Sequence, residues 1–176
     1  SWIHNLRLDG ATPYGLLDFG ITERVLPSTT DMTYISAGIT NGVLGDFKGW
    51  KLRAGDYNPY LNNLAIPGAD LRGVYFNSPA FNNKLDYTIF WGRENGGRYG
   101  TLSMVDWKAQ HSFISGFNLN FNPVTWQNYK FSVAHGWGRD RQSFLKDYAY
   151  DFIGSWNFQH YGYSYEIASD TKNLAQ

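Results

Sequence analysis

The stretch KLDYTIFWGRE, residues 84–94, decides the fold class of this chain. Apolar side chains occupy its odd positions from Leu85 to Trp91, and polar side chains occupy most of the even ones. Because successive side chains of a strand point to opposite faces, this pattern predicts a β-strand with one aromatic face and one polar face. The same alternation returns in residues 111–121, HSFISGFNLNF, and in residues 127–137, QNYKFSVAHGW.

The length of these runs favours a membrane protein. Each run continues for about ten residues, whereas strands of soluble domains usually have about 5–6 residues. A tilted strand that crosses a bilayer needs about 9–11 residues. We therefore predict an all-β fold, namely an antiparallel transmembrane β-barrel or a roughly ten-strand segment of a larger barrel, as one domain over residues 1–176.

Alternation predicts about ten strands along the chain. Besides the three runs quoted above, the expected strands cover residues 2–9, 14–22, 33–40, 49–57, 70–77, 99–108, 150–158 and 161–168. Short turns, such as residues 122–125, alternate with longer polar loops, such as residues 138–149, which is typical of an up-and-down barrel. Small residues are expected opposite the aromatic face at Gly92, Gly116, Ser132, Gly136, Gly154 and Gly162.

Composition narrows the class of protein further. The chain has 15 basic and 15 acidic residues and no basic stripe, which argues against a nucleic-acid partner. It has no cysteine, so disulfides and thiolate metal sites are excluded. Aromatic residues make up 18% of the chain, as suits strands and membrane interfaces. No apolar run approaches the roughly 18 residues of a helical span.

Two groups of candidate site residues follow from the alternation. The charged residues of the polar face would line a lumen: Arg7, Lys51, Arg53, Arg72, Lys84, Asp86, Lys130, Asp151 and Glu166. The rings of the other face would anchor the wall in lipid: Trp50, Tyr87, Trp91, Phe113, Phe121, Tyr129, Trp137, Tyr150, Trp156 and Tyr163.

The histidines give no sign of catalysis or metal binding. His4, His111, His135 and His160 form neither H-x-x-x-H nor H-E-x-x-H, and no G-x-S-x-G or phosphate-binding loop is present. We therefore expect no catalytic residues, no metal and no cofactor, and a protein that is not an enzyme.

One segment carries a resemblance to a known family. Residues 54–73 read AGDYNPYLNNLAIPGADLRG: a strand ending in Gly-Asp, a loop rich in proline and asparagine, Leu-x-x-Leu, and a second strand that opens with Leu-Arg-Gly. This segment resembles parts of large outer-membrane barrels of the SprA type, the translocons of the type IX secretion system. The resemblance implies a location in the cell outer membrane and a conduit, and it carries no catalytic residues.

The end of the chain departs from the usual barrel pattern. Outer-membrane barrels commonly finish on a strand with a terminal aromatic residue, whereas residues 170–176, DTKNLAQ, are polar. Either the chain is a segment of a longer barrel or the barrel interpretation is wrong, and we expect a segment of a longer barrel.

The predicted function is a non-enzymatic conduit or scaffold in the outer membrane for the passage of solute or protein. Its expected partners are outer-membrane lipid and other barrel strands, a plug or accessory chains. One alternative is a secreted carbohydrate-binding β-sandwich that uses Trp50, Trp91, Trp107, Trp126, Trp137 and Trp156 as stacking platforms. A second alternative is an outer-membrane hydrolase with a rim site, in which His4 or His160 would meet a serine and a carboxylate.

Overall fold

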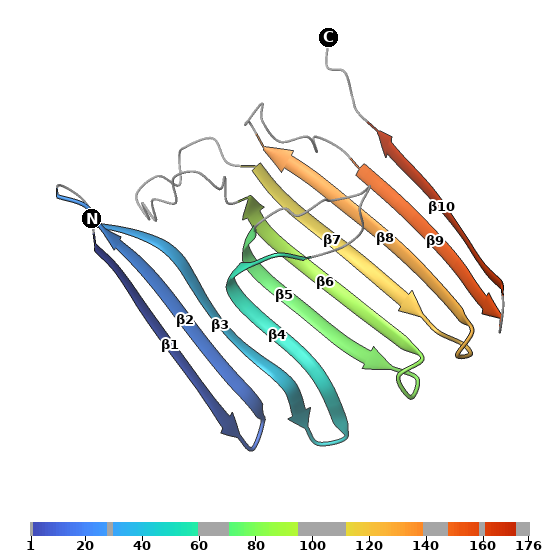
Figure 1. The fold of residues 1–176 in the computed structure, drawn as a ribbon, viewed down its shortest axis with the longest axis horizontal. Coiled ribbons are helices and arrows are strands. Elements are labelled where there is room, and N and C mark those ends of the chain that lie inside the picture. The colour runs from blue at the N-terminus through green and yellow to red at the C-terminus, as the bar shows by residue number, and fades with distance from the viewer. Residues whose placement is uncertain are drawn as a thin grey trace, which may run out of the picture.

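A computed structural model describes residues 2–27, 30–59, 71–94, 112–138, 148–158 and 161–171. These residues form one antiparallel sheet in which ten strands follow the order of the chain (Figure 1). The strands are β1 (Trp2–Thr12), β2 (Gly15–Val25), β3 (Thr30–Leu44), β4 (Phe47–Tyr57), β5 (Leu71–Ala80), β6 (Leu85–Glu94), β7 (Ser112–Phe121), β8 (Gln127–Gly138), β9 (Tyr148–Phe158) and β10 (Tyr161–Thr171).

The all-β, antiparallel prediction is confirmed, and most strands run a little longer than predicted. β1 and β10, for example, each continue three residues beyond the expected end. The alternation of apolar and polar positions becomes less regular near the strand ends, whereas the backbone hydrogen bonds between strands continue there, so the pattern predicts strands that end too early. The expected strand at residues 99–108 lies outside the described residues.

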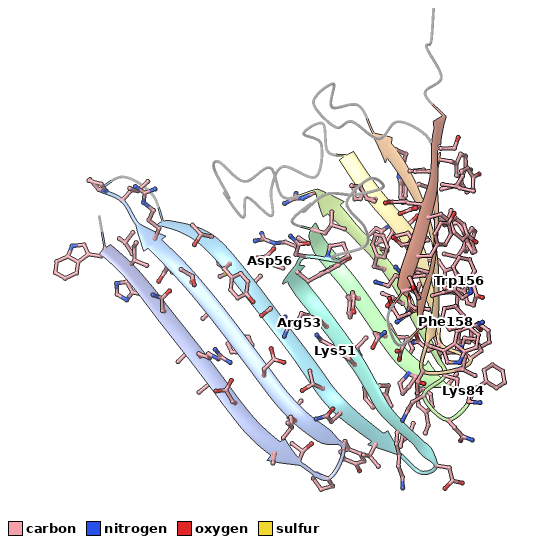
Figure 2. All side chains as sticks on the ribbon, turned by 45° about the vertical axis from the view of Figure 1, so that its right-hand side comes forward. Lys51, Arg53, Asp56, Lys84, Trp156 and Phe158 are labelled. Carbon is pink, nitrogen blue, oxygen red and sulfur yellow. The ribbon has the colours of Figure 1, made fainter. Side chains whose placement is uncertain are left out.

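The sheet is open, so the ten described strands do not form a closed barrel. Within the described part of the chain, β1 pairs only with β2 and β10 pairs only with β9. Closure would require hydrogen bonds between these two edge strands, which stand at opposite ends of the sheet (Figure 1). The curvature of the sheet turns the later strands away from the first four without bringing the two edges together (Figure 2).

Short hairpin turns connect the strands at one end of the sheet, the lower end in Figure 1. Pro13 and Tyr14 separate β1 from β2, and Gly45 and Asp46 separate β3 from β4. The connections that follow β4, β6 and β8 are longer and start at the opposite ends of the strands. This asymmetry agrees with the predicted alternation of short turns and long loops at three of the four connections of that end, whereas the β2–β3 connection, residues 26–29, is short.

Regular pairing keeps the two sides of each strand aligned across the sheet. Ile89 of β6 stands beside Phe117 of β7, and the adjacent row, on the opposite side, pairs Thr88 with Asn118. We call the side that carries Ile89 and Phe117 the aromatic face, and the side that carries Thr88 and Asn118 the polar face.

Five of the six buried hydrophobic residues in the described part of the chain form a small cluster on the polar face. They are Tyr57, Leu71, Phe90, Ile114 and Ala134, contributed by β4 to β8, and the sixth is Ala149 of β9. Each alternates along its strand with residues of the aromatic face, so the register assigns it to the polar side. The main apolar surface of the sheet therefore lies outside this core.

Gly154 corrects the expected distribution of small residues. It pairs with Tyr129 and Tyr165, so it lies on the aromatic face instead of the polar face. A Cβ at this position would lie 2.6 Å from Cε1 of Tyr165. Glycine therefore leaves room for the Tyr165 ring to cover the backbone of β9, an arrangement known to stabilise glycine in strands.

Candidate functional site

A row of polar side chains crosses the polar face from β4 to β9. The register aligns one residue of each strand, in the order Lys51, Asn77, Thr88, Asn118, Ser132 and Asp151. Asn77 donates from Nδ2 to Thr88 Oγ1 at 3.1 Å, and Asn118 donates from Nδ2 to Ser132 Oγ at 3.1 Å. These bonds fix the two amides, so the row forms an ordered polar strip across the sheet.

A second row lies one step nearer the short turns. Asp86 pairs with Asn120, and Asn120 pairs with Lys130. Asn128 donates from Nδ2 to Asn120 Oδ1 at 2.6 Å. The Asn120 amide is therefore held in place between a carboxylate on β6 and an ammonium group on β8.

Residues of both rows line a hollow of about 490 Å³ together with Tyr75 and with Asn58 and Pro59, which follow β4, whereas Ser132 and Asp151 are not part of its lining. Its volume lies in the range of about 300–1,000 Å³ that is usual for ligand pockets. Most such pockets are largely apolar, whereas this one presents amides, a hydroxyl and charged groups. The hollow suits a polar ligand or a polar solute in transit.

A separate ion pair on the polar face spans three strands. Arg53 of β4 donates from Nη2 to Asp18 Oδ2 of β2 at 3.0 Å, although β3 lies between these strands. Gly38 of β3 stands between them in the register, and a Cβ there would lie 2.9 Å from Asp18 Oδ1. Glycine at position 38 thus leaves the space in which the ion pair forms.

A buried ion pair marks the end of β4. Pairing with β3 stops at Gly55, whose φ is +100°, and a Cβ there would lie 2.2 Å from the Ile35 carbonyl oxygen. The Asp56 carboxylate then accepts from the Ile35 backbone N–H at 2.8 Å and from Arg72 of β5 at 2.6 Å. Glycine permits the bend, and the carboxylate satisfies the backbone group that the bend exposes (Figure 2 labels Asp56).

Most predicted lumen-lining residues lie on the polar face by register. These are Arg7, Lys51, Arg53, Asp86, Lys130, Asp151 and Glu166. The carboxyl groups of Glu166 on β10 and Asp151 on β9 lie close enough to interact. That these residues line a lumen stays a prediction.

Arg72 and Lys84 correct this assignment. Arg72 alternates with Leu71 and shares the side of Val74, which is the aromatic face, and its charge is paired with Asp56. Lys84 precedes β6 and lies in the turn after β5, where its N–H donates to the Phe81 carbonyl. Phe81 and the two residues that follow it have positive φ, so the hairpin turn extends through Lys84 and the strand starts one residue later than expected.

Register places all ten predicted anchoring rings on the aromatic face: Trp50, Tyr87, Trp91, Phe113, Phe121, Tyr129, Trp137, Tyr150, Trp156 and Tyr163. Their membrane-anchoring role is untested by the fold and stays a prediction.

The rings gather toward the two ends of the strands. At the strand ends that carry the long connections, Phe113 stacks between Trp91 and Trp137 at centroid distances of 5.9 and 5.8 Å. Near the short turns, Phe121 stacks on Tyr129 at 6.5 Å. Between these two bands the aromatic face carries aliphatic residues such as Ile89, Leu119 and Val133 together with the rings of Phe117 and Phe131.

At the short-turn end of β9, Trp156 and Phe158 extend this lower band (Figure 2). Trp156 contacts Tyr129 edge-on at 5.8 Å and stacks on Tyr163 of β10 at 5.7 Å. Each band thus includes rings with a polar atom, Trp91 and Trp137 at one end of the strands and Tyr129 and Trp156 at the other, the kind that suits a membrane–water boundary.

Two of the four histidines, His4 and His135, lie within the described residues. His135 stacks between Trp137 and Tyr148, at centroid distances of 5.2 and 4.5 Å. His4 stands beside Glu23 on the aromatic face, and His111 and His160 lie outside the described residues. Over the described ranges, no group of three His, Cys, Asp or Glu side chains could hold a metal ion. A helix long and apolar enough to cross a membrane is likewise not found among the described residues.

Comparison with family models, with curated proteins and with solved structures gives no match to this chain. The resemblance to SprA-type barrels therefore stays a prediction.

Sequence reasoning singled out the charged residues of the hollow, Lys51, Asp86 and Lys130, and missed its uncharged polar side chains. The candidate residues of the polar face were chosen by charge, and the lining also includes uncharged polar residues, among them Asn77, Thr88, Asn118 and Asn120. Their alternation with Ile89, Phe117 and their neighbours was the available signal, because it already assigned them to the polar face.

Proposed function

We propose that this chain forms part of the wall of a cell outer-membrane β-barrel that acts as a non-enzymatic conduit. The aromatic face lies against lipid, and the polar face lines the aqueous passage. The observation that carries this proposal is the large apolar side of a single sheet, which no second layer covers in the described part of the chain.

The exposure of the aromatic face supports a lipid environment. Ile89 in the middle of β6 is 51% exposed, and Leu6 and Ile167 on the edge strands are 50% and 66% exposed. Soluble monomers rarely expose contiguous apolar patches larger than a few hundred Å². A surface that runs across all ten strands would be unfavourable in water and favourable against acyl chains.

The spacing of the two aromatic bands also supports the proposal. Phe113 and Phe121 stand near opposite ends of β7. With a strand rise of about 3.4 Å per residue they are about 27 Å apart along the strand. A strand tilt of about 40° projects this separation to about 20 Å, close to the roughly 25 Å apolar band of outer-membrane barrels.

The two free edges indicate that more strands complete the wall. Backbone groups on an edge that faces lipid cannot bond to water, and each unsatisfied group costs several kcal/mol. β1 and β10 each present such an edge among the described strands. We therefore propose that further strands pair with both edges, from the same protein or from a partner.

The sandwich alternative receives less support. A sandwich needs a second sheet packed about 10 Å from the first, whereas the ten described strands belong to one sheet. Trp91, Trp137 and Trp156 share the aromatic face with aliphatic residues, as a lipid-facing wall requires. Trp107 lies outside the described residues.

A cysteine scan tests the membrane orientation directly, because the natural chain has no cysteine. Phe117→Cys and Asn118→Cys are adjacent on β7 and point to opposite faces. We expect that, in lipid vesicles, a water-soluble maleimide labels the cysteine at position 118 rapidly and the one at position 117 only after detergent is added. Leu119→Cys and Asn120→Cys repeat the comparison one step along the strand.

Equal labelling of adjacent positions in vesicles would overturn the proposal. A stable monomer in detergent-free buffer, with both faces labelled at the same rate, would also overturn it. A chain with an uncovered apolar face should not be a stable monomer in water. Electrophoresis in dodecyl sulfate, with and without boiling, shows in addition whether copies of this chain close a barrel by themselves.

A further inference from the structure

The hollow on the polar face contains two cations that no described acid pairs. All three ion pairs among the described residues are formed by arginines, so Lys51 and Lys130 belong to none of them. Asp86 is the one acid of the lining and also lacks an ion pair there. Two lysines and one aspartate leave the lining with one excess positive charge, which favours an anionic ligand.

The lysines stand far apart within this hollow. Lys51 is on β4 and Lys130 is on β8 (Figure 2 labels Lys51). Four strand spacings of about 4.8 Å separate them, or about 19 Å along the sheet. Lys51 Nζ lies 5.6 Å from the centre of the Tyr75 ring, which restrains one end. Because their backbones are this far apart, an elongated ligand with separated negative charges suits the two lysines better than a single small anion.

The amides between the lysines retain hydrogen-bonding capacity. Asn77 and Asn118 each use Nδ2 within the sheet, so each keeps Oδ1 as an acceptor. Asn120 accepts through Oδ1 and keeps Nδ2 as a donor, and Thr88 accepts through Oγ1 and keeps its proton to donate. Ordered donors and acceptors in alternation match hydroxyl groups, which are themselves both donors and acceptors.

We propose that this hollow binds a short acidic oligosaccharide, such as a chain of two or three uronic acids. Its carboxylates meet Lys51 and Lys130, and its hydroxyl groups bond to the amides between them. The inference rests on the proposed function, since it names the class of solute that the polar face of the conduit recognises. A volume of about 490 Å³ accommodates a ligand of this size.

Calorimetric titration of the full chain in detergent micelles with trigalacturonate tests this inference. We expect saturable binding that Lys51→Met and Lys130→Met each weaken by about tenfold, the effect of losing one charge-assisted hydrogen bond. Lys84→Met is the matched control, because Lys84 lies in the β5–β6 turn outside the hollow and should leave affinity unchanged. Asp86→Asn removes the one acid of the lining and should tighten binding, which a misfolded variant could not do.

Three results would overturn the inference: no binding of trigalacturonate, an equal loss of affinity in Lys84→Met, or competition by inorganic phosphate as strong as that of the sugar. Maltotriose, which has hydroxyl groups and no carboxylate, should bind at least about tenfold more weakly. The cysteine scan separates the two ideas. Alternating protection without sugar binding would remove only the ligand, and sugar binding without alternation would remove only the membrane wall.

Discussion

Asp56 and Arg72 are joined by two hydrogen bonds of 2.6 Å where β4 bends away from β3. Their side chains are only 8% and 13% exposed, and Asp56 also accepts the Ile35 N–H. One carboxylate thus connects β3, β4 and β5 where the regular ladder between β3 and β4 has stopped. The pair substitutes for the missing backbone hydrogen bonds.

Asp56→Asn should therefore destabilise the sheet strongly. The change leaves the Arg72 guanidinium buried without its counter-charge, a situation that typically costs about 3–5 kcal/mol. Unfolding by urea in micelles, followed by tryptophan fluorescence, measures the loss. Asp9→Asn is the control, because it breaks the exposed Arg7–Asp9 pair and should change stability by less than about 1 kcal/mol. Similar losses in both variants would contradict a structural role for Asp56.

Gly38→Ala should weaken the contact between Arg53 and Asp18. The added methyl would lie 2.9 Å from Asp18 Oδ1 and 3.1 Å from the Leu52 carbonyl oxygen, and we expect a loss of about 1–2 kcal/mol. In an Asp18→Ala background the same change should cost less, because its closest contact is gone. Additive losses in this double-mutant cycle would show that glycine serves the backbone instead of the ion pair.

Gly10→Ala is the matched glycine control. No atom outside the neighbouring residues lies within 4 Å of a Cβ at Gly10. The substitution should therefore leave the urea midpoint nearly unchanged, and a loss equal to that of Gly38→Ala would contradict the steric argument.

Tyr57→Phe should destabilise the protein by about 1–2 kcal/mol, because a buried acceptor loses its partner. The Tyr57 hydroxyl lies 2.9 Å from the Trp91 carbonyl oxygen and 3.1 Å from that of Val74, and so ties β4 to β5 and β6. Tyr163→Phe, at an exposed position of β10, should have little effect on the same unfolding curve. An equal response of the two variants would show that the Tyr57 hydroxyl contributes nothing.

Phe117→Arg should prevent stable membrane insertion, whereas Asn118→Arg should not. On the proposed wall, position 117 lies near the middle of the lipid-facing side, where an arginine costs about 2–4 kcal/mol. Position 118 faces the passage and tolerates charge. Flotation of each variant with lipid vesicles measures insertion, and equal flotation of the two would contradict the proposed orientation.

The local features of this fold were predictable from the chain. A period of two places Ile89 and Phe117 on one side and Thr88 and Asn118 on the other, because neighbouring side chains of a strand point in opposite directions. This geometry needs no knowledge of the partner strand. For this reason the strands and the predicted anchoring rings were assigned to the face on which the register places them. Gly154 was assigned to the wrong face because its even position in the strand was not taken into account.

Arg72 and Lys84 show where local reasoning fails. Arg72 carries a charge on the aromatic side, and only its pairing with Asp56, from another strand, explains how that side accepts it. Lys84 fits the alternation of β6, yet the left-handed residues before it place the turn there. Charge and period alone do not report which distant group will neutralise a side chain or where a hairpin reverses.

The amino-acid order established the β class, the approximate strands and the two-faced character of the sheet, because these depend on contacts between near neighbours. The tertiary structure decided that the described sheet stays open, that β4 bends at Gly55, and that Lys51 and Lys130 flank one hollow. Each of these depends on register and curvature accumulated over several strands, and so on the relative positions of residues far apart in the chain.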